Sequence, residues 1–368
     1  MPLNEPESSG NILLVWDRLG HYHAARFLAL EKASANAKVF IAELGAADSL
    51  YQWKNPVSHH TRYSCLSTKK VESGDLINRF LSFRKLVITN NIQTIGLSGY
   101  GRMEYLLFLL WCWLTGVHVI LFAESWYGSN KWLNTMKGWF LRKTCQGFLV
   151  SGQRAENHFH KTLKIDPARI RKGYSVVDNI HFIAPPEIER EKVLLCVARF
   201  SPEKNLERLI IAFKQSDLFQ NWTLKIVGGG PQKPHLQTLT DDCTNIELLD
   251  WLSYQALPFL YAQASFFILP STFEPWGLVV NEAMASGLPI AVSKDCGCAP
   301  DLVDVRNGFT FDSHKIDSIV FVLNQIVQLK PVEFELMGKR SKEIIAHYKT
   351  EDWASQFLKL YELNNNDF

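Results

Sequence analysis

Residues 270–293 read PSTFEPWGLVVNEAMASGLPIAVS, and two glutamates in this stretch stand in unusual places. Glu274 lies in a turn with proline and glycine, whereas Glu282 lies inside an almost wholly apolar run. Buried carboxylates are rare unless a partner satisfies them. The run predicts a helix from about Gly277 to Gly287, because glycine suits the left-handed residue that ends a helix. A helix N-terminus favours negative charge, which suits Glu274 just before it.

Short apolar runs alternate with helical patterns along all 368 residues. The predicted strands are 12–16, 38–41, 92–97, 117–122, 147–150, 192–197, 222–227, 246–249, 265–269, 289–292 and 308–311. This alternation is typical of α/β proteins with parallel sheets. We therefore predict two doubly wound, Rossmann-like domains facing a cleft, with ligands at the carboxyl ends of the strands.

A break at residues 173–191, rich in proline and charge, reads as a linker. The predicted domains are 1–183 and 184–345. Residues 346–368 should form a C-terminal helix and polar tail that pack back toward the first domain. The chain is long enough for two substantial cores.

Composition bears on three questions: nucleic-acid binding, the redox state of the cysteines and metal binding. The net charge of +2 leaves no footprint for nucleic acid, so no such partner is expected. The seven cysteines are scattered, which indicates reduced thiols in a cytoplasmic protein. Cys296 and Cys298 could be read as metal ligands, but they lack a second pair at zinc spacing, so we predict no metal site.

The apolar run 105–123 has the length of a membrane span. However, Thr115 and Gly116 break it, and His118 lies inside it. A helix to about Leu114 followed by a buried parallel strand from Val117 explains it better. The N-terminus is polar and predicts no signal peptide.

Two loops carry the features of an anion site. In ARFSPEKN, residues 198–205, Arg199 and Lys204 follow a strand and precede a helix, which suits a diphosphate. In VGGGP, residues 227–231, Gly229 and Gly230 would let the backbone approach a ligand closely. A solvated surface loop and a tight turn are the respective alternatives.

The two glutamates would accept hydrogen bonds from sugar hydroxyls, since a carboxylate can only accept. Glu282 could hold a ribose diol, and Glu274 the hydroxyls of a transferred sugar. The alternatives are a buried glutamate satisfied by a protein donor and a carboxylate that stabilises a helix dipole.

An ordered set of motifs resembles one family. VARFSPEKNLERLIIAF, LKIVGGGP, the two glutamates with seven residues between them, GCAPDLV and NGFTF occur in that order between residues 192 and 312. They resemble the retaining glycosyltransferases of the GT-B fold, the large group 1 family also numbered four. The first half is similar mainly in its alternation and in GYSVVDNIHF.

The resemblance implies a role for each motif. Arg199 and Lys204 would neutralise the diphosphate leaving group, and Glu274 would touch the donor sugar. The remaining donor-binding positions implied are Gly229, Gly230, Asp250, Trp251, Leu252, Gly277, Leu278 and Glu282. The nucleotide-diphosphate sugar would be a co-substrate, with no cofactor and no metal. The family retains the anomeric configuration and builds glycans such as surface polysaccharides on a glycan or lipid-linked sugar.

The first half departs from the family pattern. Trp16-Asp17-Arg18-Leu19-Gly20 replaces the usual Gly-Gly turn, and Glu124-Ser125 stands where many members carry a histidine. The candidates for holding the acceptor are therefore Asp17, His21, His23, Arg102 and Glu124. For each of these residues a purely structural role is the alternative.

Residues 131–145, KWLNTMKGWFLRKTC, read as a basic amphipathic helix. Such a helix suits peripheral contact with the inner face of an anionic membrane, and ordinary packing on the sheet is the alternative. Two other functions stay open: a nucleotide-sugar epimerase or hydrolase of the same fold, and a non-catalytic sugar-nucleotide-binding scaffold.

Overall fold

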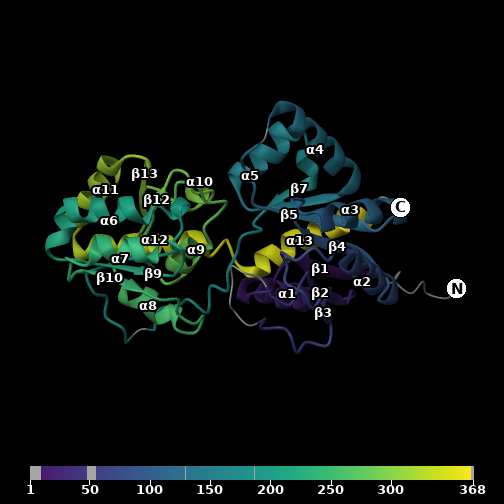
Figure 1. Ribbon diagram of the computed structural model, residues 1–368, viewed down its shortest axis with the longest axis horizontal. Coiled ribbons are helices and arrows are strands. Elements are labelled where there is room, and N and C mark those ends of the chain that lie inside the picture. Colours follow the sequence, from purple (N-terminus) through teal and green to yellow (C-terminus); the bar gives the residue numbers. More distant parts are fainter. Residues whose placement is uncertain (1–9, 48–54, 129, 186, 366–368) are drawn as a thin grey trace. The chain divides into compact units, whose positions relative to one another are not determined.

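The computed structural model describes residues 10–47, 55–128, 130–185 and 187–365 (Figure 1). The predicted polar N-terminus and the last residues of the tail lie outside these ranges. The chain forms two compact units, one of Met1–Val176 with Thr350–Phe368 and one of Val177–Lys349. The units thus divide at 176/177 and 349/350, whereas the sequence places the divisions at 183/184 and 345/346.

The first unit contains a seven-stranded parallel sheet in the order β3-β2-β1-β4-β5-β6-β7. Its strands are β1 Asn11–Trp16, β2 Val39–Glu43, β3 Tyr63–Cys65, β4 Ile92–Ser98, β5 His118–Ala123, β6 Gly147–Val150 and β7 Ile170–Lys172. The strand order reverses between β1 and β4. Ligands of doubly wound sheets bind at such a switch point.

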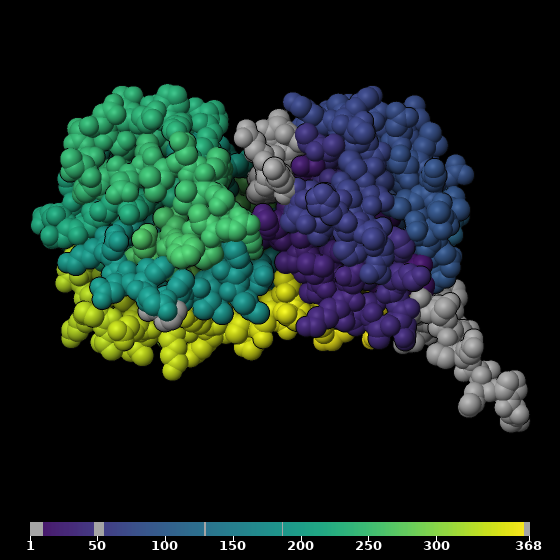
Figure 2. Space-filling view, turned by 90° about the horizontal axis from the view of Figure 1, so that it is seen from below, coloured from purple at the N-terminus to yellow at the C-terminus, as the bar shows by residue number. Residues whose placement is uncertain are grey.

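Helices cover this sheet on both faces. They are α1 His21–Ala33, α2 Leu76–Thr89, α3 Met103–Thr115, α4 Lys131–Thr144, α5 Gln153–Asn157 and α13 Thr350–Asn365, with a π-helical turn His158–Thr162 and a 3-10 turn Pro167–Arg169. Helix α13 packs on α1 and on β5, β6 and β7. Figure 2 shows the yellow C-terminal residues beside the purple N-terminal ones in this unit.

The run at 105–123 divides as the sequence predicts. Helix α3 ends at Thr115, and Gly116 follows in the left-handed region with φ 76°. The buried strand β5 begins at His118. Among the described residues, no helix combines the length and the apolar character needed to cross a bilayer.

The second unit contains a six-stranded parallel sheet in the order β10-β9-β8-β11-β12-β13. Its strands are β8 Val193–Val197, β9 Thr223–Val227, β10 Ile246–Leu249, β11 Phe266–Leu269, β12 Ile290–Ser293 and β13 Gly308–Phe311. The helices are α6 Leu206–Gln215, α7 Lys233–Thr240, α8 Leu257–Gln263, α9 Leu278–Ala285, α10 Ala299–Leu302, α11 Ile316–Gln328 and α12 Pro331–Ile345, with 3-10 turns Pro202–Lys204 and Asp217–Gln220. The prediction of two Rossmann-like α/β domains is confirmed.

Candidate functional site

The second sheet reverses its strand order between β8 and β11, so the loops that follow these two strands are neighbours. The loop after β8 carries Arg199 and Lys204, and the loop after β11 carries Glu274. These three predicted residues therefore come together at the switch point of the sheet, where doubly wound folds bind their ligands.

Lys204 and Glu274 form a largely buried ion pair. The Lys204 Nζ donates a hydrogen bond to Oε2 of Glu274, and only 11% and 14% of the two side chains are exposed. Asn205 holds the lysine loop in place, since its Nδ2 donates to the carbonyls of Pro270 (3.0 Å) and Ser313 (2.8 Å). The loop after β8 is thus tied to the end of β11.

Arg199 is paired with Glu203, a residue that no motif in the sequence singles out. The Arg199 Nη2 lies 3.3 Å from Oε1 of Glu203, and the Ser201 hydroxyl donates to the same oxygen at 2.6 Å. Burial alone would raise the pKa of Glu203. The hydrogen bond from Ser201 and the nearby cations Arg199 and Lys204 together outweigh burial, so the pKa lies below its usual value. The Thr272 amide donates to the Glu203 carbonyl at 2.9 Å, which links both loops again.

The glycine run after β9 is required by local packing. Gly228 and Gly230 have φ values of 155° and 149°, and a Cβ on Gly230 would lie 2.6 Å from the Phe200 carbonyl oxygen. A side chain at Gly229 would be less crowded, since its Cβ would lie 3.0 Å from Nε1 of the Trp251 side chain. The tight turn is therefore present, and close approach to a ligand stays a prediction for Gly229 and Gly230.

The loop after β10 presents its side chains to solvent. Trp251 is 56% exposed and Leu252 39% exposed. Asp250 is also exposed and forms an ion pair with Lys233 at 2.5 Å. Strands β10, β9, β8 and β11 are consecutive in the sheet, so these residues, the glycines, the cations and Glu274 follow one another along its carboxyl edge.

The apolar run 278–285 forms α9, and both of its polar side chains have partners. Glu282 is wholly buried and accepts a hydrogen bond from the Tyr261 hydroxyl at 2.6 Å. Asn281 accepts one from Trp276 Nε1 at 2.9 Å. The Glu282 carboxylate thus lies below the surface in this structure, and a direct contact with ribose would require it to move.

The turn before α9 explains two further positions. Gly277 has φ 106°, and a Cβ there would lie 2.9 Å from Cδ2 of Leu269, so only glycine fits. Leu278 begins α9 and is half-buried. Both residues come shortly after Glu274 and determine how the turn that carries Glu274 leads into α9.

A second group of charges lies at the switch point of the first sheet. The Tyr105 hydroxyl donates to Oδ1 of Asp17, and Arg102 Nη1 lies 3.7 Å from Oδ2 of Asp17. Burial raises the pKa of Asp17 although Tyr105 and Arg102 oppose this shift. Glu104 lies 3.6 Å from Arg102 and 2.5 Å from the buried Arg79. The sequence pointed to Asp17 and Arg102 but gave no signal for the other three.

The remaining acceptor candidates follow β1 and β5, which flank β4 in the sheet, and make contacts of their own. Glu124 follows β5 and accepts a hydrogen bond from the Ser175 hydroxyl at 2.6 Å. His21 is the first residue of α1 and is half-buried. His23 accepts a hydrogen bond from the Gly20 amide at 3.0 Å, and burial together with Arg26 lowers its pKa to about 3. His23 is therefore a structural cap rather than a proton donor at neutral pH.

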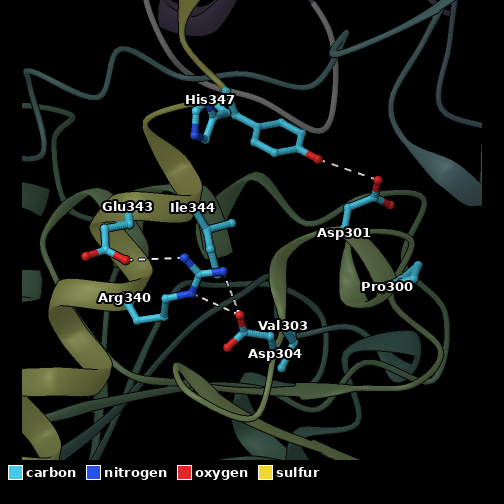
Figure 3. A pocket seen from close by; sticks show the side chains of 9 residues that line it. Pro300, Asp301, Val303, Asp304, Arg340, Glu343, Ile344 and His347 are labelled. Carbon is cyan, nitrogen blue, oxygen red and sulfur yellow. Dashed lines mark hydrogen bonds and ion pairs between the residues drawn. The ribbon is translucent and has the colours of Figure 1, made fainter.

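A cavity of about 370 Å³ in the second unit lies between α10 and α12 (Figure 3). Its lining residues are Pro300, Asp301, Val303, Asp304, Arg340, Glu343, Ile344, His347 and Tyr348. Arg340 pairs with Asp304 at 2.8 Å and with Glu343 at 3.2 Å. None of the donor-binding and acceptor candidates named above lines this cavity, and Arg340, its main cation, is already paired with carboxylates. Across the described residues, no group of three or more His, Cys, Asp or Glu is placed to hold a metal ion.

The second unit has the sequence pattern of a known family. Residues 178–344 match the family model described as "Glycosyl transferases group 1". This segment is a group 1 glycosyltransferase domain. The family predicted from the ordered motifs is therefore confirmed for the unit that carries Arg199, Lys204, Glu203 and Glu274.

Three known proteins illustrate the relationship. The chain is 24% identical over 197 residues, 50% of its length and 47% of the relative's, to the GDP-mannose-dependent α-(1-6)-phosphatidylinositol monomannoside mannosyltransferase of Mycolicibacterium smegmatis. It superposes on sucrose-phosphate synthase from Thermosynechococcus elongatus with TM-score 0.75, 19% identity and coverage of 98% and 100% of the two chains. It superposes on Anabaena HepE in complex with UDP and glucose with TM-score 0.71 and 14% identity, covering 95% of this chain and 98% of that chain.

These matches differ in what they establish. The structural similarity extends over both units and shows the GT-B glycosyltransferase fold. The chain spans less than half of the length of the curated relatives it matches. Those relatives are glycosyltransferases by name.

Proposed function

We propose that the protein is a retaining glycosyltransferase that moves a sugar from a nucleotide-diphosphate sugar to an acceptor hydroxyl. The observation that carries this proposal is the meeting of Arg199, Lys204 and Glu274 at the switch point of a group 1 glycosyltransferase domain. Two fixed cations suit a diphosphate, and a carboxylate beside them suits sugar hydroxyls.

The cations would act on the leaving group. Breaking the bond between sugar and phosphate leaves negative charge on the nucleotide, and preorganised cations stabilise charge that grows in the transition state. Arg199 and Lys204 supply that charge without a metal ion. Glu274 would orient the sugar by accepting its hydroxyl hydrogens.

The nucleotide would extend along the carboxyl edge of the sheet. Strands in a sheet lie about 4.8 Å apart, so β10 is roughly 10 Å from β8. This spacing would put the base near Asp250, Trp251 and Leu252, the ribose near Gly229 and Gly230, and the diphosphate at Arg199. Glu282, buried within α9, would support this site from below the surface.

The acceptor would bind the first unit at Asp17 and Arg102. Asp17 presents a carboxylate for an acceptor hydroxyl, and Arg102 offers donors beside it. The acceptor proposed is a glycan or lipid-linked sugar in glycolipid or surface-polysaccharide synthesis. Peripheral membrane contact through residues 131–145 belongs to the same proposal, because a membrane-bound acceptor requires the enzyme to work at the lipid surface.

Thermal shift with UDP, GDP, ADP, dTDP and their sugars tests the donor site. A ligand at 100 times its Kd stabilises the native state by about 2.7 kcal/mol. We expect one nucleotide family to raise the Tm of the wild type and not that of Arg199→Ala. Arg306→Ala is the matched control, because Arg306 is an exposed arginine of the same unit paired with Asp304.

Two results would redirect the proposal. No stabilisation of the wild type by any member of the panel would favour the scaffold alternative. Release of free nucleotide from a nucleotide sugar at the same rate with and without candidate acceptors would favour the epimerase or hydrolase.

A further inference from the structure

Helix α3 is apolar along most of its length, but only one of its sides is buried. Its inward side enters the core of the first unit through Phe108, Leu109 and Cys112. Its outward side exposes large apolar side chains, as does that of α4. These side chains are Met103 (61% exposed), Leu110 (41%), Trp113 (50%) and Leu114 (68%) on α3, and Trp132 (67%), Leu133 (38%), Met136 (51%) and Trp139 (59%) on α4.

The two helices form one surface. Strands β4, β5 and β6 are consecutive neighbours, and right-handed crossovers in one direction place α3 and α4 on the same face of the sheet. The helices also pack directly on each other. The inward sides of both helices contribute to the same hydrophobic core, so their outward sides face solvent on the same side of the first unit. We call the eight exposed side chains above the α3–α4 face.

The exposed charged side chains on α3 and α4 have one sign. The only acidic residue of α3 is Glu104, which is buried and paired with Arg79, and α4 has none. Lys131 and Lys143 are exposed on α4. The π-helical turn His158–Thr162 packs against α4 and adds the exposed Lys161.

We infer that the α3–α4 face binds the surface of an anionic lipid membrane, with α3 as well as α4 entering the boundary between headgroups and acyl chains. This inference deepens the membrane contact proposed for residues 131–145. Monomeric proteins rarely expose contiguous apolar surface of this kind. Tryptophan beside lysine is the combination found at membrane interfaces, whereas lysine is depleted from protein–protein interfaces.

The structure also shows which basic residues can be reversed in charge without disturbing the fold. Arg142 donates from Nη1 to the Leu163 carbonyl at 2.6 Å, so reversing its charge would disturb the fold. Lys131 and Lys143 are exposed and avoid that difficulty. Each lysine near an anionic surface adds about 1 kcal/mol of attraction, which is roughly a fivefold change in partitioning.

Vesicle co-sedimentation of the full chain tests the inference. Two vesicle types are compared, phosphatidylcholine alone and equal parts of phosphatidylcholine and phosphatidylglycerol. We expect binding to the anionic vesicles only. Trp113→Gln with Leu114→Gln should reduce this binding at least tenfold, and Lys131→Glu with Lys143→Glu should do the same. Glutamine keeps the helix propensity of α3.

Phe321→Gln with Leu336→Gln is the matched control. These two side chains are 66% and 61% exposed on α11 and α12 of the other unit, so they remove similar apolar area away from the face. This variant should bind vesicles like the wild type. Each variant is first checked for an unchanged Tm and for nucleotide stabilisation, which separates a failure of this inference from a failure of the proposed glycosyltransferase function.

Three outcomes would overturn the inference. Full vesicle binding by the α3 variant, with loss in Trp132→Gln/Trp139→Gln, would restrict the contact to α4. Equal losses in the α3 variant and the control would show that the face has no special role. Wild-type protein that ignores both vesicle types but self-associates in light scattering, and becomes monomeric in the α3 variant, would assign the face to a second copy.

Discussion

Lys204 and Glu274 show how single residues set the character of the donor site. Their ion pair is largely buried, so neither charge is free of the other in this structure. Removing one member of a buried pair leaves the second charge uncompensated, which is costly. A diphosphate that binds Lys204 therefore competes with Glu274, and a sugar hydroxyl at Glu274 would relieve that competition.

We expect Glu274→Gln to bind UDP about tenfold more tightly, which corresponds to about 1.4 kcal/mol. It should gain little or no affinity for UDP-glucose, because an amide is a weaker acceptor for sugar hydroxyls. Isothermal titration with both ligands, or with the nucleotide pair that stabilises the wild type, measures this difference. Glu343→Gln is the control, because Glu343 is 50% exposed and pairs with Arg340, which is not among the proposed donor-binding residues. An unchanged ratio of the two affinities would contradict the competition.

His23 gives a prediction about pH. Burial lowers its pKa to about 3, while the unfolded chain has a histidine pKa of about 6.5. The unfolded state therefore binds the proton first, so stability is complete above about pH 6.5 and falls as pH decreases toward 3. His23→Asn keeps an acceptor for the Gly20 amide without a titratable group. Its Tm should fall less than the wild-type Tm between about pH 7 and about pH 5, and parallel curves would refute the assignment.

At the scale of elements, most of the fold could be predicted because most strands are buried on both faces. Strands such as β1 and β8 read as continuous apolar runs. The edge strands β3 and β7 were missed, since Tyr63–Cys65 and Ile170–Lys172 are short and expose polar residues. At the site, strand-end loops pointed to Arg199, Lys204 and Glu274. Tyr105 and Glu203 were not predictable, because their roles depend on contacts with other loops.

The turn after β9 provides a test of the loop architecture. Gly230→Ala would place a Cβ 2.6 Å from the Phe200 carbonyl oxygen at a φ of 149°, so we expect a loss of about 1–3 kcal/mol. The shift would also move the chain next to Arg199, so nucleotide stabilisation should weaken. Gly74→Ala is the control, since a Cβ there meets nothing within 4 Å. Chemical denaturation measures both variants, and equal stabilities would show that the turn tolerates a side chain.

At the scale of the whole molecule, the chain passes into the second unit after Val176 and returns to the first at Thr350. Helix α13 completes the first unit by covering β5, β6 and β7. Its Trp353 is wholly buried, with its ring 5.7 Å from that of Phe122 on β5. Helix α13 thus stabilises the unit that also contains β1, whereas the second unit is one continuous segment.

This organisation predicts that Trp353→Ala weakens only the first unit, by about 3–5 kcal/mol, the usual cost of deleting a buried aromatic side chain. Calorimetry should show a lower transition for that unit. The nucleotide-dependent stabilisation of the second unit should persist, because Arg199, Lys204 and Glu274 all lie between Val177 and Lys349. Trp132→Ala, at a tryptophan that is 67% exposed, should change stability by less than about 0.5 kcal/mol. Loss of nucleotide binding in Trp353→Ala would instead mean that the donor site depends on the C-terminal helix.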